Sequence, residues 1–180
     1  MPRSLSDWLT YQETLNPAEI DLGLERVARV AARLNLRPPA GRVFTVAGTN
    51  GKGSCVAAIA AVLGANALRT GVYTSPHLLN YNERICVAGR PATDARLVAA
   101  FERVEAARET IPLTYFEFGT LAALLIFSMT ECEAWMLEVG LGGRLDAVNV
   151  LDADYPVITT VDLDHQAWLG DTVEAIAAEK

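Results

Sequence analysis

The sequence predicts an α/β domain built on a mostly parallel sheet with helices on both faces. Two short apolar runs, residues 43–47 and 134–139, stop at glycine-rich segments and have the composition of buried strands. Stretches with apolar residues at helical spacing separate such runs, and strands that alternate with helices favour a parallel sheet. With 180 residues, 51% of them hydrophobic, the chain can form one sizeable core.

Turn and capping residues set the bounds of the expected elements. Asn16-Pro17 ends the first helix, Asp21 is a candidate N-cap for the second, and Thr93 is one for a later helix. The apolar run 121–129 is expected to be a buried helix, because a bilayer span needs ~20 residues. In chain order we expect helices at 4–15 and 22–34, a strand at 43–47, a helix at 54–67, a turn at 69–71, strands at 72–74 and 83–87, helices from 93 and at 117–130, strands at 134–139 and 157–161, and a helix at 172–180.

The glycine-rich loop after residues 43–47 is typical of P-loop NTPase-like folds. Its glycines let backbone N–H groups approach phosphate oxygens, and the start of the next helix adds a positive dipole end. Lys52 supplies a positive charge for the β- and γ-phosphates, and the Ser54 hydroxyl can reach Mg²⁺. We therefore expect ATP to be bound by Gly48, Thr49, Asn50, Gly51, Lys52, Gly53 and Ser54.

The loop departs from the usual G-x-x-x-x-G-K-[ST] pattern at two positions. Ala47 replaces the first glycine, and Gly53 stands between Lys52 and Ser54. The alternative interpretation is an ordinary strand-to-helix turn that carries a surface lysine.

Polar residues follow three further expected strands, at the sheet edge where ligands of open α/β sheets bind. Glu138 lies in an apolar strand, so it is either a metal ligand or a partner in a buried salt bridge. Ser75, considered alone, is an ordinary turn residue, and His165 is an ordinary loop histidine. Because magnesium prefers oxygen ligands, Asp162 or Asp164 would be the first choice on chemistry alone.

Composition excludes several classes of protein. The net charge of −7 argues against a nucleic-acid or anionic-membrane partner. Three cysteines without a C-x-x-C pair argue against a disulfide framework or a zinc site, and fit a reducing cytoplasm. No apolar signal-peptide run follows Met1.

The motif Gly-Thr-Asn-Gly-Lys-Gly-Ser resembles the phosphate loop of the folylpolyglutamate synthase and dihydrofolate synthase family, whose fold is of the Mur ligase central-domain type. Residues 75–85, 138–147, 163–170 and 176–180 resemble four further signatures of that family. The resemblance implies that Ser75, Glu138 and His165 bind magnesium together with a carbamylated Lys180. It also implies catalytic roles for Lys52, His165 and Lys180. On its own, Lys180 would be a solvated helix lysine.

The resemblance extends to segments that would line a pterin pocket. The segment 20–27 is similar to the family's N-terminal segment, and 114–118 to its pterin-side segment. For Tyr115 and Phe116 the alternative is ordinary core packing. The implied substrate residues are Ile20, Asp21, Leu22, Thr114, Tyr115, Phe116, Glu117, Leu145, Asp146 and Ala147.

Together these residues lead us to expect an ATP- and Mg²⁺-dependent amide-bond ligase. It would add L-glutamate to dihydropteroate and to the γ-carboxyl of folates through an acyl phosphate. Two alternatives remain: a Mur-type ligase acting on a UDP-linked sugar acid, and a P-loop nucleotide-binding module without ligase chemistry.

We further expect residues 1–180 to be the N-terminal portion of the ATP-binding domain, with the C-terminal glutamate ligase domain outside this chain. These residues alone should therefore form no product. The full-length protein is expected to be a cytoplasmic monomer.

Overall fold

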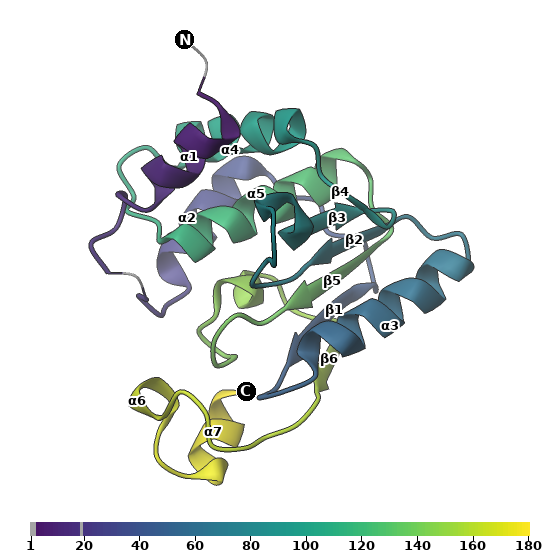
Figure 1. The fold of residues 1–180 in the computed structure, drawn as a ribbon, viewed down its shortest axis with the longest axis vertical. Helices are drawn as coiled ribbons and strands as arrows, with labels where there is room; N and C mark the ends of the chain where they lie inside the picture. Colours follow the sequence, from purple (N-terminus) through teal and green to yellow (C-terminus); the bar gives the residue numbers. More distant parts are fainter. Residues whose placement is uncertain (1–2, 19) are drawn as a thin grey trace.

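The computed structural model describes residues 3–18 and 20–180 and has one six-stranded sheet (Figure 1). The strand order is β4-β3-β2-β5-β1-β6. Neighbours among β2, β5, β1 and β6 pair in parallel, whereas β3 pairs antiparallel with β2 and β4. The strands are β1 (Val43–Ala47), β2 (Thr70–Tyr73), β3 (Ile85–Val87), β4 (Arg90–Pro91), β5 (Ala134–Glu138) and β6 (Tyr155–Ile158).

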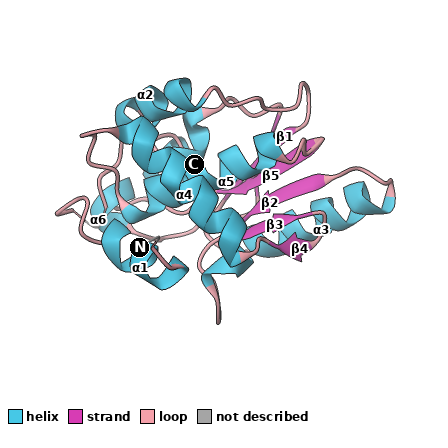
Figure 2. Cartoon of the chain, turned by 90° about the horizontal axis from the view of Figure 1, so that it is seen from above, coloured by secondary structure: helices cyan, strands magenta, loops and turns pink. Residues whose placement is uncertain are grey.

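Helices cover both faces of the sheet (Figures 1 and 2). On one face lies α3 (Lys52–Ala65), and on the other α1 (Leu5–Gln12), α2 (Glu25–Leu34), α4 (Asp94–Arg108) and α5 (Tyr115–Met129). Beyond β6 the chain forms α6 (Gln166–Leu169) and α7 (Val173–Glu179). Two short 3-10 helices are η1 (Tyr81–Arg84) and η2 (Ala147–Val150). The expected mostly parallel sheet with helices on both faces is confirmed.

The side chains of β1 point alternately to the two faces of the sheet, and each face has its own hydrophobic cluster. Val43 and Ala47 belong to the larger cluster, which includes α5, whereas Val46 packs with Val56 of α3 in the smaller one. A residue period of two sends successive strand side chains to opposite faces. The run 121–127 of α5 is almost fully buried, as expected of a buried helix.

Several sequence-based bounds were wrong for identifiable reasons. Asp21 is not an N-cap, because α2 begins at Glu25 and the cap is Leu24. Thr70 and Gly71 lie in β2 rather than in a turn. A Cβ on Gly71 would be 2.6 Å from the Phe127 ring, so this glycine permits close packing of α5 on the sheet.

Other differences are smaller. The last strand is β6 at Tyr155–Ile158, earlier than the expected 157–161, and α3 begins at Lys52 rather than at 54. The expected strand at 83–87 divides into η1 and β3, which turns back into β4 through Ala88 and Gly89 at positive φ. No helix among the described residues is long and apolar enough to cross a membrane.

Candidate functional site

The loops at the carboxyl edge of the four parallel strands bring the predicted site residues to one end of the molecule. In Figure 1 the C-terminus and α7 lie beside the loop that joins β1 to α3. The loops after β2 and β5 open at the same edge, because neighbouring parallel strands end together.

The phosphate loop is attached to the segment that leaves β6. The Thr159 hydroxyl donates to the Asn50 carbonyl at 2.6 Å, and the Thr49 amide donates to the Thr160 carbonyl at 2.8 Å. A Cβ on Gly48 would overlap the Thr159 hydroxyl, so only glycine fits there. Gly51 caps α3 at a φ of 84°, in the left-handed region that favours glycine.

Lys52 folds back over this loop. Its Nζ donates to the Gly48 carbonyl at 2.9 Å and to the Thr49 carbonyl at 3.4 Å. The ammonium group therefore lies over the loop, and its partners among the described residues are neutral acceptors, which an anionic ligand could replace.

Glu138, the last residue of β5, is a buried carboxylate beside the phosphate loop. It is 6% exposed, and its Oε2 accepts from the Ser75 amide at 3.0 Å. A Cβ on Gly53 would lie only 3.6 Å from its Oε1. Burial raises the pKa of Glu138, while the Ser75 N–H and the charge of Lys52 oppose that rise. No described basic group forms an ion pair with it, so the described residues supply no partner for the salt-bridge alternative.

His165 and Lys180 lie on the segment after β6. The His165 side chain is 47% exposed, with Nε2 3.5 Å from Asp164 Oδ1. Burial and the charge of Lys52 lower the pKa of Lys180, and Asp164 opposes this shift. Within the described ranges, no three His, Cys, Asp or Glu side chains form a metal-binding group.

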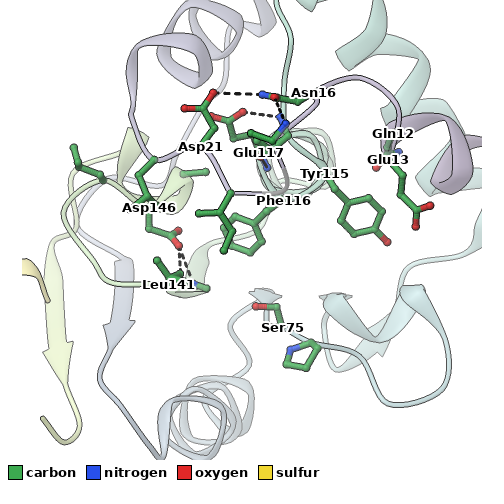
Figure 3. A pocket seen from close by; sticks show the side chains of 18 of the residues that line it. Gln12, Glu13, Asn16, Asp21, Ser75, Tyr115, Phe116, Glu117, Leu141 and Asp146 are labelled. Carbon is green, nitrogen blue, oxygen red and sulfur yellow. Dashed lines mark hydrogen bonds between the residues drawn. The ribbon is translucent and has the colours of Figure 1, made fainter. Parts of the chain in front are cut away.

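A cavity of about 770 Å³ opens beside Glu138, and all ten residues predicted for the substrate pocket line it (Figure 3). Ser75 lines the same cavity, so its backbone N–H joins the cavity wall to Glu138. Tyr115 and Phe116 are only partly buried and line this space, although both also pack against the larger core cluster. The further lining residues are Gln12, Glu13, Asn16, Pro17, Ala18, Pro76, Arg84, Gly140 and Leu141.

Arg26 connects two carboxylates of the cavity wall. Its Nη1 lies 2.9 Å from Asp21 Oδ2 and its Nη2 2.9 Å from Glu117 Oε1. Glu117 also accepts from the Thr114 amide at 2.7 Å, which completes the capping box of α5. Burial raises the pKa of Glu117, while these hydrogen bonds oppose the rise.

Asp146 is held entirely by backbone donors. Its Oδ2 accepts from Gly140 and Leu141 at 3.0 and 2.9 Å, and its Oδ1 accepts from Val148 at 3.0 Å. At 3% exposure, burial raises the pKa of Asp146 to about 6 in spite of these three N–H groups.

Sequence reasoning missed several residues of this site. Arg26 was not predicted, because its partner Glu117 is 91 positions away in the chain. Arg84 Nε donates to His77 Nδ1 at 2.8 Å, and its guanidinium lies 5.6 Å from the Tyr115 ring centroid. Gln12 was also missed, although its position four residues after the buried Trp8 places it on the inner side of α1.

Comparisons with known proteins agree with this geometry. The chain is 51% identical to the dihydrofolate synthase/folylpolyglutamate synthase of Escherichia coli strain K12, over 98% of this chain and 42% of that protein. E. coli FolC in complex with DHPP and ADP matches at a TM-score of 0.96 and 50% identity, over 98% of this chain and 43% of that one.

A bifunctional folylpolyglutamate synthase/dihydrofolate synthase with Mn, AMPPNP and L-glutamate bound matches at a TM-score of 0.91 and 49% identity. The match includes 98% of this chain and 43% of that chain. The chain thus spans about two fifths of the length of the relatives it matches. No protein-family model matches the chain.

Proposed function

We propose that this chain, which belongs over 98% of its length to the dihydrofolate synthase/folylpolyglutamate synthase family, forms the ATP- and pterin-binding part of a folate ligase. The γ-phosphoryl group of ATP moves to a carboxylate oxygen of dihydropteroate or of a folate, and ADP leaves. The amine of L-glutamate attacks the acyl phosphate, inorganic phosphate leaves, and an amide forms as the nitrogen loses a proton.

The observation that carries this proposal is the junction of two sites at Glu138. The phosphate loop passes this carboxylate at Gly53, and the cavity wall reaches it through the amide of Ser75. A carboxylate on a ligand in the cavity can therefore approach a phosphate on the loop. Phosphoryl transfer depends mainly on such positioning and on charge neutralisation.

Lys52 and the loop N–H groups would neutralise the phosphates of ATP. The ammonium group of Lys52 bonds with carbonyls of its own loop in this structure. These neutral acceptors are weaker partners than phosphate oxygens. The relatives' complexes with ADP, and with AMPPNP and Mn, support ATP and a divalent cation as cofactors.

The residues present fit a magnesium ion. Within the part of the chain that the structure describes, Glu138 is buried without a basic partner, and such a carboxylate is stabilised by a cation. We propose that Ser75, Glu138 and His165 bind the ion, with Lys180 as a further ligand after carbamylation. The ion would neutralise phosphate charge. Burial and then the nearby charge of Lys52 lower the pKa of Lys180, and this shift favours the neutral amine that reacts with CO₂.

The same proposal covers the organisation of the protein. The described residues contain a phosphate loop and a substrate cavity, which fits the N-terminal portion of the ATP-binding domain. Three free cysteines fit a protein of the reducing cytoplasm. We propose a monomer with small-molecule substrates.

Substrate-dependent ADP formation tests the function. The purified protein is given ATP, Mg²⁺, bicarbonate and L-glutamate with either dihydropteroate or a UDP-linked sugar acid, and Lys52→Ala is the matched control. ADP or acyl-phosphate formation that requires dihydropteroate supports the proposal. A requirement for the sugar acid supports a Mur-type ligase instead, and nucleotide binding without pterin binding supports a plain P-loop module.

A further inference from the structure

Gln12, the last residue of α1, is an unusual member of the cavity wall. Its side chain lines the cavity and is 1% exposed, yet neither Oε1 nor Nε2 has a hydrogen-bond partner among the described residues (Figure 3). A buried amide without partners is costly, since both its donor and its acceptor lose hydrogen bonds with water. An apolar side chain of similar size would avoid this cost.

The side-chain amides and carboxylates of the wall that are buried or partly buried are, apart from Gln12, already engaged by the protein. Asn16 bonds with Asp21, the Pro112 carbonyl and the Ala18 amide. Asp21 and Glu117 pair with Arg26, and Asp146 accepts from three backbone amides. Of these groups, Gln12 alone keeps both a donor and an acceptor for a ligand.

We propose that the Gln12 amide is a specificity-determining contact for the ring system of the bound substrate, an inference that rests on the proposed function. Its Nε2 donates to a ring carbonyl, and its Oε1 accepts from the adjacent ring N–H. A cyclic amide edge, such as that of a pterin, presents this donor and acceptor side by side. Carboxylates cannot make this pair of contacts when ionised, because they only accept.

The test is a cycle of two proteins and two ligands. Wild type and Gln12→Met are titrated calorimetrically with pteroate and with its 4-deoxy analogue, which lacks the ring carbonyl and the adjacent N–H. We expect Gln12→Met to bind pteroate at least about tenfold more weakly, because both ligand hydrogen bonds of the amide are lost. Both proteins should bind the analogue equally well, and the variant's melting temperature should equal or exceed that of wild type.

Thr10→Met, an exposed change on the same helix, is the matched control and should leave both affinities unchanged. If Gln12→Met folds poorly, Gln12→Leu replaces it. Binding of pteroate by wild type with unchanged affinity in the variant would overturn the contact and leave the proposed function standing. An equal loss for both ligands would also overturn it, since that indicates a distorted cavity. If wild type binds no pteroate, both the contact and the proposed function fail.

Discussion

The two halves of the candidate site differ in how completely the protein satisfies their charged groups. In the cavity half, Asp146 has three backbone donors and Glu117 has Arg26 and the Thr114 amide. In the phosphate half, Glu138 has one backbone donor and Lys52 has only carbonyls of its own loop. The cavity half is therefore preformed, whereas the phosphate half has charges that remain to be neutralised.

This difference separates stability from ligand binding. A group that is paired within the protein contributes to folding, and its removal leaves a buried partner unsatisfied. A group without a charged partner contributes little to folding and much to binding an oppositely charged ligand. Substitutions in the cavity half should thus lower stability, and those in the phosphate half should mainly lower affinity for nucleotide or metal.

The largest effect is expected for Lys52→Ala. The β- and γ-phosphates lose their positive partner, so ATP should bind at least ~100-fold more weakly. The melting temperature should hardly change, because the lysine bonds only with its own loop. Calorimetry with Mg²⁺-ATP measures the affinity, with Arg90→Ala in the far edge strand β4 as the control. Equal ATP affinity in the Lys52 variant and wild type would remove the lysine from the site.

Arg26→Met should lower the stability of the protein and leave its ATP affinity unchanged, the reverse of Lys52→Ala. It leaves Glu117, which is nearly buried, without its ionic partner, and the free energy of unfolding should fall by ~2 kcal/mol. ATP affinity should be unchanged. Urea denaturation measures the loss, and Arg29→Met, an exposed change on the same helix, should have little effect. A stable Arg26 variant with weakened ATP binding would reverse the comparison.

Glu138→Gln should keep the fold and bind Mn²⁺ at least ~10-fold more weakly, since the amide has nearly the same shape without the charge. Electron paramagnetic resonance follows free Mn²⁺ as a stand-in for magnesium. Glu133→Gln, an exposed change at the other end of β5, is the matched control. If both variants bind Mn²⁺ like wild type, Glu138 is not a metal ligand.

The arrangement of strands and helices could be predicted because each element has a local signal. The apolar runs of β1 and β5 and the capping residue Thr93 lie in contiguous sequence. Gly71 was misplaced because its reason is tertiary: the Phe127 ring packs against it from α5. The bounds of β3 and β4 could not be predicted for a different reason, because both strands are too short to show a periodic pattern.

Within the candidate site, the sequence could indicate the residues that follow strands. It could not indicate the residues of other elements that bond with them or complete the cavity wall. The phosphate loop and the cavity residues belong to recognisable motifs. Arg26 and Gln12 belong to helices whose surface patterns are ordinary. The role of Arg26 depends on Glu117, which is distant in sequence, and that of Gln12 on an amide without hydrogen-bond partners among the described residues. Hydrogen-bond satisfaction is a property of three-dimensional packing, so these two residues emerged only from the structure.

The preformed half should also respond to pH. The pKa of Asp146 is raised by burial from 3.8 to about 6, so the folded protein holds this proton more tightly than the unfolded chain does. Between about pH 4 and pH 6, the unfolded chain therefore ionises first. The contribution of this group to stability is present at low pH and is lost as pH rises through this window.

Comparison of wild type with Asp146→Asn isolates that contribution. The asparagine does not titrate, and replacing an oxygen by an amide nitrogen lowers stability by a constant amount wherever it meets a backbone N–H. The wild-type advantage in unfolding free energy should accordingly shrink by ~2 kcal/mol from pH 4 to pH 6 and level off about one pH unit higher. Urea denaturation at half-unit pH steps measures this difference. An advantage that grows with pH would mean that the three backbone N–H groups outweigh burial, and that the carboxylate is preorganised in its charged form.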